Sequence, residues 1–435
     1  MTIDGTSLAG GNRGIRVADA FQYPCVALAI INAGIVATAW LSGSGPNDFV
    51  GVWAAGHLAL EGTPRAAYDW SAHKAVEDFA AGFAFAGTYP WLYPPSFLLV
   101  AAVVALVPYT LAHVMWPIVT SVAYLGTIRA IIQHRIAILL AAAFPGAMAN
   151  MLAEQNGFLS AGLFGAALVL MERRPVLSGC LLGLLTYKPQ LGLLIPLALI
   201  AGGRWRAFCS AAIVAVTVAA VSWVAFGSAT WAAFANSSRG AMRILADHPA
   251  SGHKLQTVFG LVLSLGGSES AAWLLQAATI AACAVFIWVV WRRAIAFEVQ
   301  AAGLVTVSLL ATPYLYIYDL VVLAVPMAFL IRLGRTDGFL AGETSGLAAA
   351  SLLLMSSLLV DGPVGLAAVL IVTLLVARRA LPLRGLGQRI ASGRSPCDGP
   401  PSTEFPHVSP SGPRAASAAR LHREPHRARE REAQR

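Results

Sequence analysis

The chain has 435 residues, of which 57% are hydrophobic and only 12% are charged, and its mean hydropathy is +0.68. Because soluble domains are about 25% charged, this composition excludes an ordinary soluble protein and predicts an all-α polytopic integral membrane protein. The net charge of +9 comes mostly from residues 378–435, which hold twelve Arg and five acids. It therefore describes a basic tail and gives no reason to expect a nucleic-acid partner.

The first expected helix is the apolar run 24–41, which follows a polar segment, 1–22, that carries Arg13 and Arg16. A basic segment before an apolar run is also the pattern of a cleaved signal peptide. The polar segment is long for such a signal. We therefore interpret 1–22 as a cytoplasmic segment and 24–41 as a retained transmembrane helix.

A loop of about fifty residues, 43–93, is expected outside the membrane after this helix. It holds five acids against Arg65 and Lys74. An apolar stripe predicts a helix that lies along the outer membrane surface, and 70–82 is a second candidate for such a helix. The stripe consists of Phe49, Trp53, Leu58 and Leu60.

Residues 23–382 are expected to form the membrane domain, because apolar stretches without charge recur through them. A helix needs about 20 residues to span a membrane, so several of these stretches predict short, broken or tilted helices. Internal prolines fit that reading, because packed neighbours can satisfy the freed backbone groups. The stretches are 94–128, 136–153, 155–171, 175–187, 189–203, 207–227, 270–291, 299–318, 320–331, 344–360 and 362–377.

Basic residues in short loops predict the topology, because cytoplasmic loops carry an excess of Lys and Arg. With every basic pair inside and 94–128 as one crossing plus a membrane-dipping segment, the chain has about twelve transmembrane helices. Thirteen is the alternative if Arg129 and Arg135 break the rule. The pairs are Arg13/Arg16, Arg129/Arg135, Arg173/Arg174, Arg204/Arg206, Arg292/Arg293, Arg332/Arg335 and Arg378/Arg379.

The end of the chain, 383–435, is rich in Arg, Pro, Ser and Ala and poor in large apolar residues. This composition predicts a disordered basic tail in the cytoplasm. The five Cys show no CxxC spacing, so we expect apolar buried thiols and neither a disulfide framework nor a zinc site.

Polar residues gather on the predicted outer side, at the ends of four separate apolar stretches. Such groups are costly at membrane depth and usually face a cavity, so the four groups predict a single site. The first contains Asp48 and the second Tyr93. The third contains Gln155, Asn156, Lys188 and Gln190, and the last contains Tyr318 and Asp319.

Each of these residues also has a purely structural interpretation. Asp48 suits the N-cap of a helix, Lys188 can extend its ammonium to the membrane interface, and Tyr93 can be an interfacial aromatic. Residues 154–156 can be a polar turn. Asp319 is the hardest to explain in this way, because an apolar run follows it directly and no basic residue lies near it in sequence.

The order of several segments resembles glycosyltransferase family 87 across roughly residues 45–335. The segments are NDFVGVWAAGHLALEGTPRAAYD, YPPSFLLV, QNGFLSAGLFGAALVLMERRPVLSGCLLGLLTYKPQLGLLIPLALIAGGRWRA, HKLQTVFGLVLSLG and TPYLYIYDL. The resemblance implies a GT-C fold, a polyprenyl-phosphate sugar donor, an outward-facing site in the cell (inner) membrane and an inverting reaction without a metal or cofactor. Mycobacterial members are α-1,2-mannosyltransferases, and the family's catalytic carboxylate corresponds to Asp48.

This chain departs from the family pattern at two places, which leaves the sugar and the acceptor open. It has Tyr318 and Asp319 where the mannosyltransferase branch tends to carry histidines. It also reads Glu154-Gln155 where the family often reads Gly-Gln.

The chemistry of sugar transfer assigns a role to two of the residues. A sugar phosphate has a good leaving group, so it needs positive charge on the phosphate, which Lys188 offers. The acceptor hydroxyl needs a base, which Asp48 offers, and one displacement inverts the anomeric centre. We expect the other site residues to bind a polyprenyl-phosphate sugar and a glycolipid or glycan acceptor within the lipid bilayer.

Two other classes of protein remain as alternatives. A lipid or sugar transporter or flippase would carry paired charges inside the membrane and inverted repeats, and the sequence shows no clear repeat. A non-catalytic scaffold of an envelope assembly complex is the second alternative. It would tolerate replacement of Asp48, whereas a transferase would not.

Overall fold

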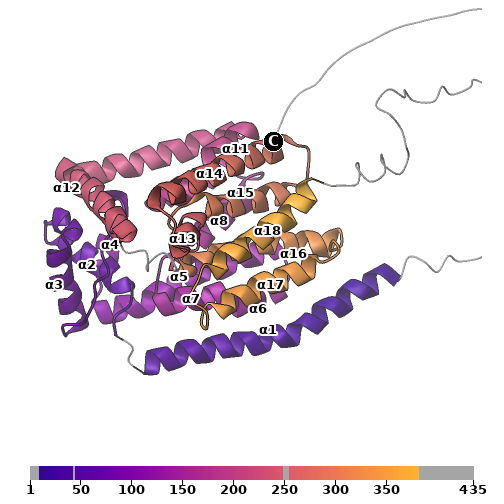
Figure 1. The fold of residues 1–435 in the computed structure, drawn as a ribbon, viewed down its shortest axis with the longest axis horizontal. Helices are drawn as coiled ribbons and strands as arrows, with labels where there is room; N and C mark the ends of the chain where they lie inside the picture. Colours follow the sequence, from indigo (N-terminus) through magenta and orange to yellow (C-terminus); the bar gives the residue numbers. More distant parts are fainter. Residues whose placement is uncertain (1–8, 43–44, 248–253, 382–435) are drawn as a thin grey trace, which may run out of the picture. The chain divides into compact units, whose positions relative to one another are not determined.

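A computed structural model describes residues 9–42, 45–247 and 254–381. Across these residues the chain forms helices, and its one isolated β-bridge joins Leu255 to Tyr316 (Figure 1). The predicted all-α fold is therefore confirmed. The predicted tail, 383–435, lies outside the described residues.

The helices follow one another along the chain, most of them with short connections within the described ranges (Figure 1). The elements up to residue 105 are α1 (Ala9–Leu41), α2 (Phe49–Leu60), η1 (Pro64–Tyr68), α3 (Trp70–Ala81) and α4 (Pro95–Ala105). They are followed by α5 (Tyr109–Ile132), α6 (Ile136–Ala143), α7 (Pro145–Ala153), α8 (Gly157–Leu170), α9 (Pro175–Leu184), η2 (Leu185–Tyr187), α10 (Pro189–Gly192) and α11 (Ile195–Ala201). The last are α12 (Trp205–Asp247), α13 (Val258–Ser264), α14 (Glu269–Arg292), α15 (Phe297–Ala311), η4 (Ile317–Leu323), α16 (Ala324–Thr336), α17 (Glu343–Ser356) and α18 (Val364–Ala380).

Helix α2 is buried by protein on nearly all sides, so its prediction as an amphipathic helix on the membrane surface was wrong. The physical reason is close packing against α4: a Cβ at Gly56 would overlap the backbone carbonyl of Ala101. The indole of Trp53 also donates a hydrogen bond to the carbonyl of Val107, at 2.9 Å. The apolar stripe of α2 is therefore core, and only Leu60 is exposed among its four members.

The helix expected over 70–82 is present as α3, and the residues buried along it are His73 and Glu77. The buried carboxylate of Glu77 accepts a hydrogen bond from the backbone N–H of Tyr89, at 2.9 Å. This contact ties α3 to the extended segment that leads into α4.

Several helices are broken where the sequence carries Pro or Gly. Helices α6 and α7 form a pair that is bent by 57° at the junction before Pro145. Pro189 begins a new helix after Lys188, and Gly227 adopts a φ of 77° that kinks α12. Past this kink, α12 turns toward α4 and packs on it (Figure 1).

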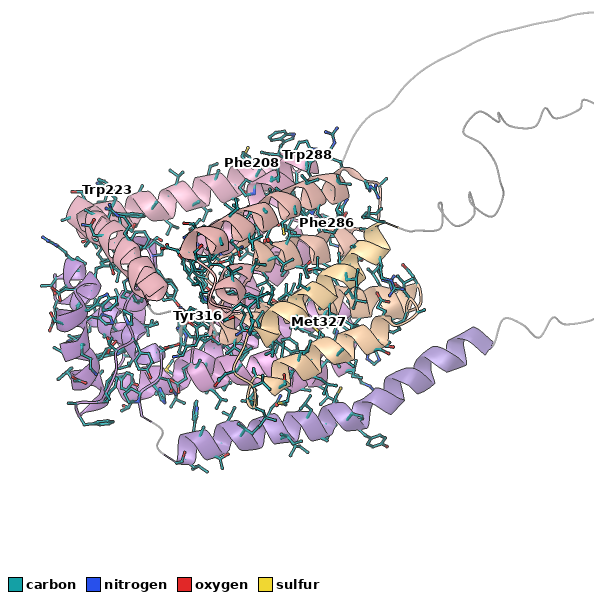
Figure 2. All side chains as sticks on the ribbon, viewed as in Figure 1. Phe208, Trp223, Phe286, Trp288, Tyr316 and Met327 are labelled. Carbon is teal, nitrogen blue, oxygen red and sulfur yellow. The ribbon has the colours of Figure 1, made fainter. Side chains whose placement is uncertain are left out.

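Five of the described helices are long and apolar enough to cross a membrane, or six if the bent pair α6–α7 is one span. They belong to α1, α5, α12, α14 and the joined η4–α16. Large apolar side chains project from their outer surfaces: Trp223 is 53% exposed and Trp288 is 37% exposed (Figure 2). Exposed tryptophans on apolar helices are typical of surfaces that contact lipid. The protein is a multi-pass membrane protein.

The basic loops are joined to one another by polar contacts at the ends of these helices. These contacts link loops that are far apart in sequence, so the helix ends that carry them lie close together in space. They are Arg204 with Glu172 (3.5 Å), Arg332 with Glu298 (3.4 Å), Arg379 with Glu343 (2.6 Å) and Arg293 with the carbonyl of Ala380 (3.2 Å).

Candidate active site

Asp48 lies one residue before α2, but its carboxylate does not cap the helix. It occupies the N-cap position without a capping hydrogen bond from its side chain, so the structural interpretation of Asp48 as a cap was wrong. Instead, its Oδ2 accepts a hydrogen bond from Nε2 of Gln155, at 2.9 Å. The acid at the exit of α1 is thus directed toward the bundle.

The pKa of Asp48 is raised to about 6, mainly because burial disfavours the charged carboxylate. The hydrogen bond from Gln155 opposes this rise. Among nearby charges, those of Asp319 and Glu154 raise the pKa further and that of Lys188 lowers it. The four segments that the sequence predicted to share a site therefore influence one another electrostatically.

Gln155 can present only its amide nitrogen to Asp48. Its Oε1 accepts a hydrogen bond from the backbone N–H of Asn156, at 3.2 Å, and one from the hydroxyl of Tyr93, at 2.9 Å. A backbone N–H is always a donor, so the orientation of the amide follows from the network. Gln155 therefore holds the Asp48 carboxylate in a defined direction and links it to Tyr93.

Lys188 and Asp319 form a buried ion pair, with Nζ 2.5 Å from Oδ1. The side chain of Lys188 is 4% exposed and that of Asp319 is 9% exposed, so the interpretation of Lys188 as an interfacial anchor was wrong. The other oxygen of Asp319 accepts a hydrogen bond from the backbone N–H of Tyr316, at 3.2 Å. The partner that Asp319 lacks in the local sequence comes from 131 residues earlier in the chain.

Tyr318, Asn156 and Gln190 differ in how closely they join this group. Tyr318 stacks on Tyr316 with ring centres 5.5 Å apart and interacts electrostatically with Asp48. Asn156 is fully buried next to Gln155. Gln190 is half-buried in α10 and makes no hydrogen bond within the described residues, so the structure does not connect it to Asp48.

His113, which lies on α5 beside the site, was not predicted from the sequence. Its Nδ1 is 2.8 Å from Oε2 of Glu154, whose Oε1 accepts a hydrogen bond from Asn47, at 3.1 Å. The available signal was weak: His113 is the one titratable side chain other than tyrosine in the run 94–128.

Aromatic rings form a wall behind Tyr93. Trp91 stacks on Phe97 with ring centres 5.7 Å apart, and Phe97 stacks on Tyr187 at 4.5 Å. Tyr187 also shares a 2.6 Å hydrogen bond with Ser160. Trp91, Phe97 and Tyr187 are all buried, so the wall belongs to the protein core.

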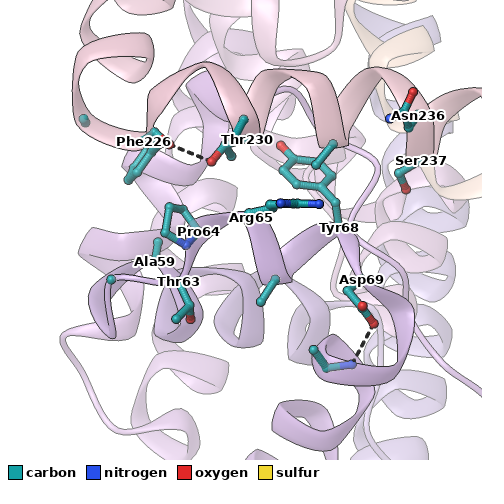
Figure 3. Close-up of a pocket in the computed structure, with 16 residues that line it drawn as sticks. Ala59, Thr63, Pro64, Arg65, Tyr68, Asp69, Phe226, Thr230, Asn236 and Ser237 are labelled. Carbon is teal, nitrogen blue, oxygen red and sulfur yellow. Dashed lines mark hydrogen bonds between the residues drawn. The ribbon is translucent and has the colours of Figure 1, made fainter.

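A groove of about 920 Å³ lies between η1 and the kinked part of α12 (Figure 3). Its lining includes Arg65, Thr230 and Asn236 but not Asp48. Tyr68, at its edge, donates a hydrogen bond to the carbonyl of Tyr93, at 2.8 Å. The groove is therefore separate from the carboxylate cluster, although one tyrosine connects their walls.

No three His, Cys, Asp or Glu side chains are placed to share a metal ion within the described part of the chain. The groups around Asp48 are instead one lysine, two further carboxylates (Asp319 and Glu154) and a set of amides and tyrosines. Such a set provides a base, a cation and hydrogen-bond donors. It defines the protein as a polytopic membrane protein with a cluster of charged and hydrogen-bonding side chains around Asp48.

The model of glycosyltransferase family 87 matches residues 91–313, just over half of the chain. The chain belongs to glycosyltransferase family 87, which confirms the resemblance seen in the sequence. Comparisons with curated proteins and with solved structures found no match. The protein is thus a membrane glycosyltransferase, which uses a sugar donor and a glycan acceptor. The matched range contains Tyr93, Gln155 and Lys188, whereas Asp48 and Asp319 lie outside it.

Proposed function

We propose that the protein transfers a sugar, mannose or another hexose, from a polyprenyl-phosphate donor to a hydroxyl of a glycolipid or glycan. Asp48 is the general base and the anomeric centre is inverted. The observation that carries this proposal is the half-buried carboxylate of Asp48, whose pKa is raised to about 6 while Gln155 fixes its direction. A base with such a pKa is charged at neutral pH and still accepts a proton readily.

In the proposed step, the acceptor oxygen attacks the anomeric carbon while its proton moves to the Asp48 carboxylate. The bond between the anomeric carbon and the phosphate oxygen breaks, and its electron pair leaves with the polyprenyl phosphate. One displacement inverts the centre, so a β-linked donor gives an α-linked product. The step, as proposed, uses no metal ion and no cofactor.

Lys188 is proposed to stabilise the departing phosphate. A cation in a water-poor site interacts strongly with a charge that develops on the leaving group. In the structure this cation is paired with Asp319, at 2.5 Å. We propose that the donor phosphate takes over part of this interaction, and that Tyr93, Asn156 and Tyr318 border the bound sugar and acceptor.

The same proposal places the protein as a GT-C fold in the cell (inner) membrane, with the site on the extracytoplasmic face and 383–435 in the cytoplasm. The polar contacts among the basic loops support one shared cytoplasmic side. Helix α4 is then the membrane-dipping segment, and twelve crossings alternate between the two faces. They are α1, α5, α6–α7, α8, α9, α10–α11, α12, α14, α15, η4–α16, α17 and α18.

The direct test incubates the purified protein, in liposomes, with a panel of radiolabelled polyprenyl-phosphate hexoses and pentoses and a membrane lipid extract. The expected result is a labelled glycolipid or glycan, with the anomeric configuration of the donor inverted by NMR. Mass spectrometry of envelope glycolipids with and without the gene then identifies the acceptor. Transfer from nucleotide sugars alone, retention of configuration, or movement of labelled lipid across the bilayer without a new glycosidic bond would contradict the proposal.

A further inference from the structure

Two adjacent residues before α2 are held by two adjacent residues after α7. Asn47 donates a hydrogen bond to Glu154, at 3.1 Å, and Asp48 accepts one from Gln155, at 2.9 Å. Both contacts join residues that are 107 positions apart. The turn after α7 therefore makes hydrogen bonds to two consecutive side chains, Asn47 and Asp48, in the segment before α2.

Glu154 makes this contact from an unfavourable backbone conformation. Its φ is 54°, and the only other residue with a side chain and a positive φ, within the described ranges, is Gln133 at 55°. The left-handed region brings Cβ close to the backbone and is costly for residues other than Gly, and such strain tends to persist where it serves a function. Glu154 is also 1% exposed, so a charged side chain is both buried and strained at this position.

The second oxygen of Glu154 has an ion-pair partner on another helix. Nδ1 of His113 lies 2.8 Å from it, and the His113 ring stacks on Trp40 with ring centres 5.5 Å apart. Helices α1 and α5 thus fix the carboxylate that grips Asn47. A side chain used only to fill the turn would not need two such polar partners.

We propose, on the basis of the proposed function, that Glu154 is a positioning residue for the general base. It fixes the Asn47–Asp48 segment so that the Asp48 carboxylate meets the acceptor hydroxyl, and it keeps a negative charge beside that carboxylate. Glu154 does not touch the reacting atoms in this role. It acts through Asn47, and through its charge on Asp48.

Because Glu154 carries a charge, its proposed effect on Asp48 can be measured in the pH profile of turnover. A negative neighbour raises the pKa of Asp48, so its removal lets Asp48 ionise at lower pH. Activity that depends on the charged base then persists further into acid. The other ionisable groups that face Asp48 and remain in place are Lys188, Asp319, Tyr89, Tyr93, Tyr316 and Tyr318, with His113 behind Glu154.

Three substitutions distinguish the effect of the Glu154 side chain from the effect of its backbone conformation. Glu154→Gln keeps an oxygen that accepts from Asn47 but removes the charge, so turnover at its plateau should stay within about threefold and the acid limb should move to lower pH. Glu154→Ala and Glu154→Gly both remove the hydrogen bond to Asn47, so turnover should fall by about 10- to 100-fold with little change in donor KM. Glu154→Gly should unfold no earlier than Glu154→Ala, because Gly adopts the positive φ without strain.

Gln133 provides the matched control, because it has the same backbone conformation at an exposed position after α5. Gln133→Ala and Gln133→Gly should leave turnover and its pH profile at parental values. The Asp48→Asn variant is measured beside them to test the base itself. Parental turnover in that variant would remove the proposed general base, and this outcome is distinct from any result at Glu154.

Two results would overturn the role of Glu154. The first is a Glu154→Gly variant with parental turnover and acid limb, since the backbone alone would then suffice. The second is an equal loss in all three Glu154 variants without movement of the acid limb, since that pattern describes a general structural defect.

Discussion

Replacing Asp48 with asparagine is expected to lower turnover and to raise thermal stability in the same molecule. Asparagine keeps the size of the side chain, and its oxygen can still accept the 2.9 Å hydrogen bond from Gln155. It cannot accept the proton of the acceptor hydroxyl. Turnover should therefore fall by about 10²- to 10⁴-fold, the usual share of general-base catalysis.

The stability gain follows from the cost of holding a charge at this half-buried position. A carboxyl whose pKa rises from 3.8 to about 6 on folding destabilises the folded chain at neutral pH by about 3 kcal/mol at most. Below pH 3.8 the group is protonated in both states, and this cost is absent. It grows as pH rises between the two values and is complete above about 6. Asparagine carries no charge, so this destabilisation of the folded state is absent in the variant.

The assay compares thermal unfolding of the parent and Asp48→Asn in the same detergent between pH 4 and pH 8. The variant should unfold a few degrees higher at pH 7, and the difference should shrink toward pH 4. Turnover of the parent should fall below about pH 6, where the base becomes protonated. A variant that is less stable at pH 7, or one that retains parental turnover, would refute the reasoning, because Asp48 would then be a structural residue.

Three further results are expected. Lys188→Met alone should destabilise the fold by about 3–5 kcal/mol, because it leaves Asp319 buried and unpaired. The Lys188→Met/Asp319→Asn double variant should fold and still lose affinity for a radiolabelled polyprenyl-phosphate sugar. Parental affinity in the double variant would show that Lys188 has only a structural role. Single cysteines in a Cys-free background should be labelled in intact cells at position 61 and not at position 173, and the reverse pattern would refute the topology. Gly56→Val should disrupt packing of α2 on Ala101 and cost about 1–3 kcal/mol or more, seen as a lower unfolding temperature that Gly45→Val, at an open position, does not show.

The sequence predicted the parts of the site that depend on local pattern. A carboxylate just after the first apolar run, and polar residues at the ends of other runs, were enough to place Asp48, Gln155 and Asp319 in one group. The burial of α2 was not predictable in this way. It depends on a glycine that meets a backbone carbonyl of α4, 45 residues later, and periodicity does not distinguish an apolar face packed on lipid from one packed on protein.

The ion pair between Lys188 and Asp319 also could not be predicted from local sequence patterns. Each residue stands beside a run of apolar residues, and nothing between these two residues, which are 131 positions apart, marks them as partners. Two unpaired charges predict two separate roles, whereas the structure makes them one neutral unit. This changes the expected effect of a single substitution, because removal of either charge leaves the other buried.

Helix breaks explain why the chemistry gathers where it does. A broken helix inside a membrane frees backbone groups that only protein side chains can satisfy, and amides do this at several breaks: Asn32 donates to the carbonyl of Ala143 at 3.1 Å, and Gln276 donates to that of Leu310 at 2.9 Å. Asp319 does the same for a backbone N–H while it holds Lys188. At this last break, the side chain that satisfies the backbone is also one of the charged groups near Asp48. Long uninterrupted helices satisfy their own backbone groups, so they would not require such polar side chains inside the bundle.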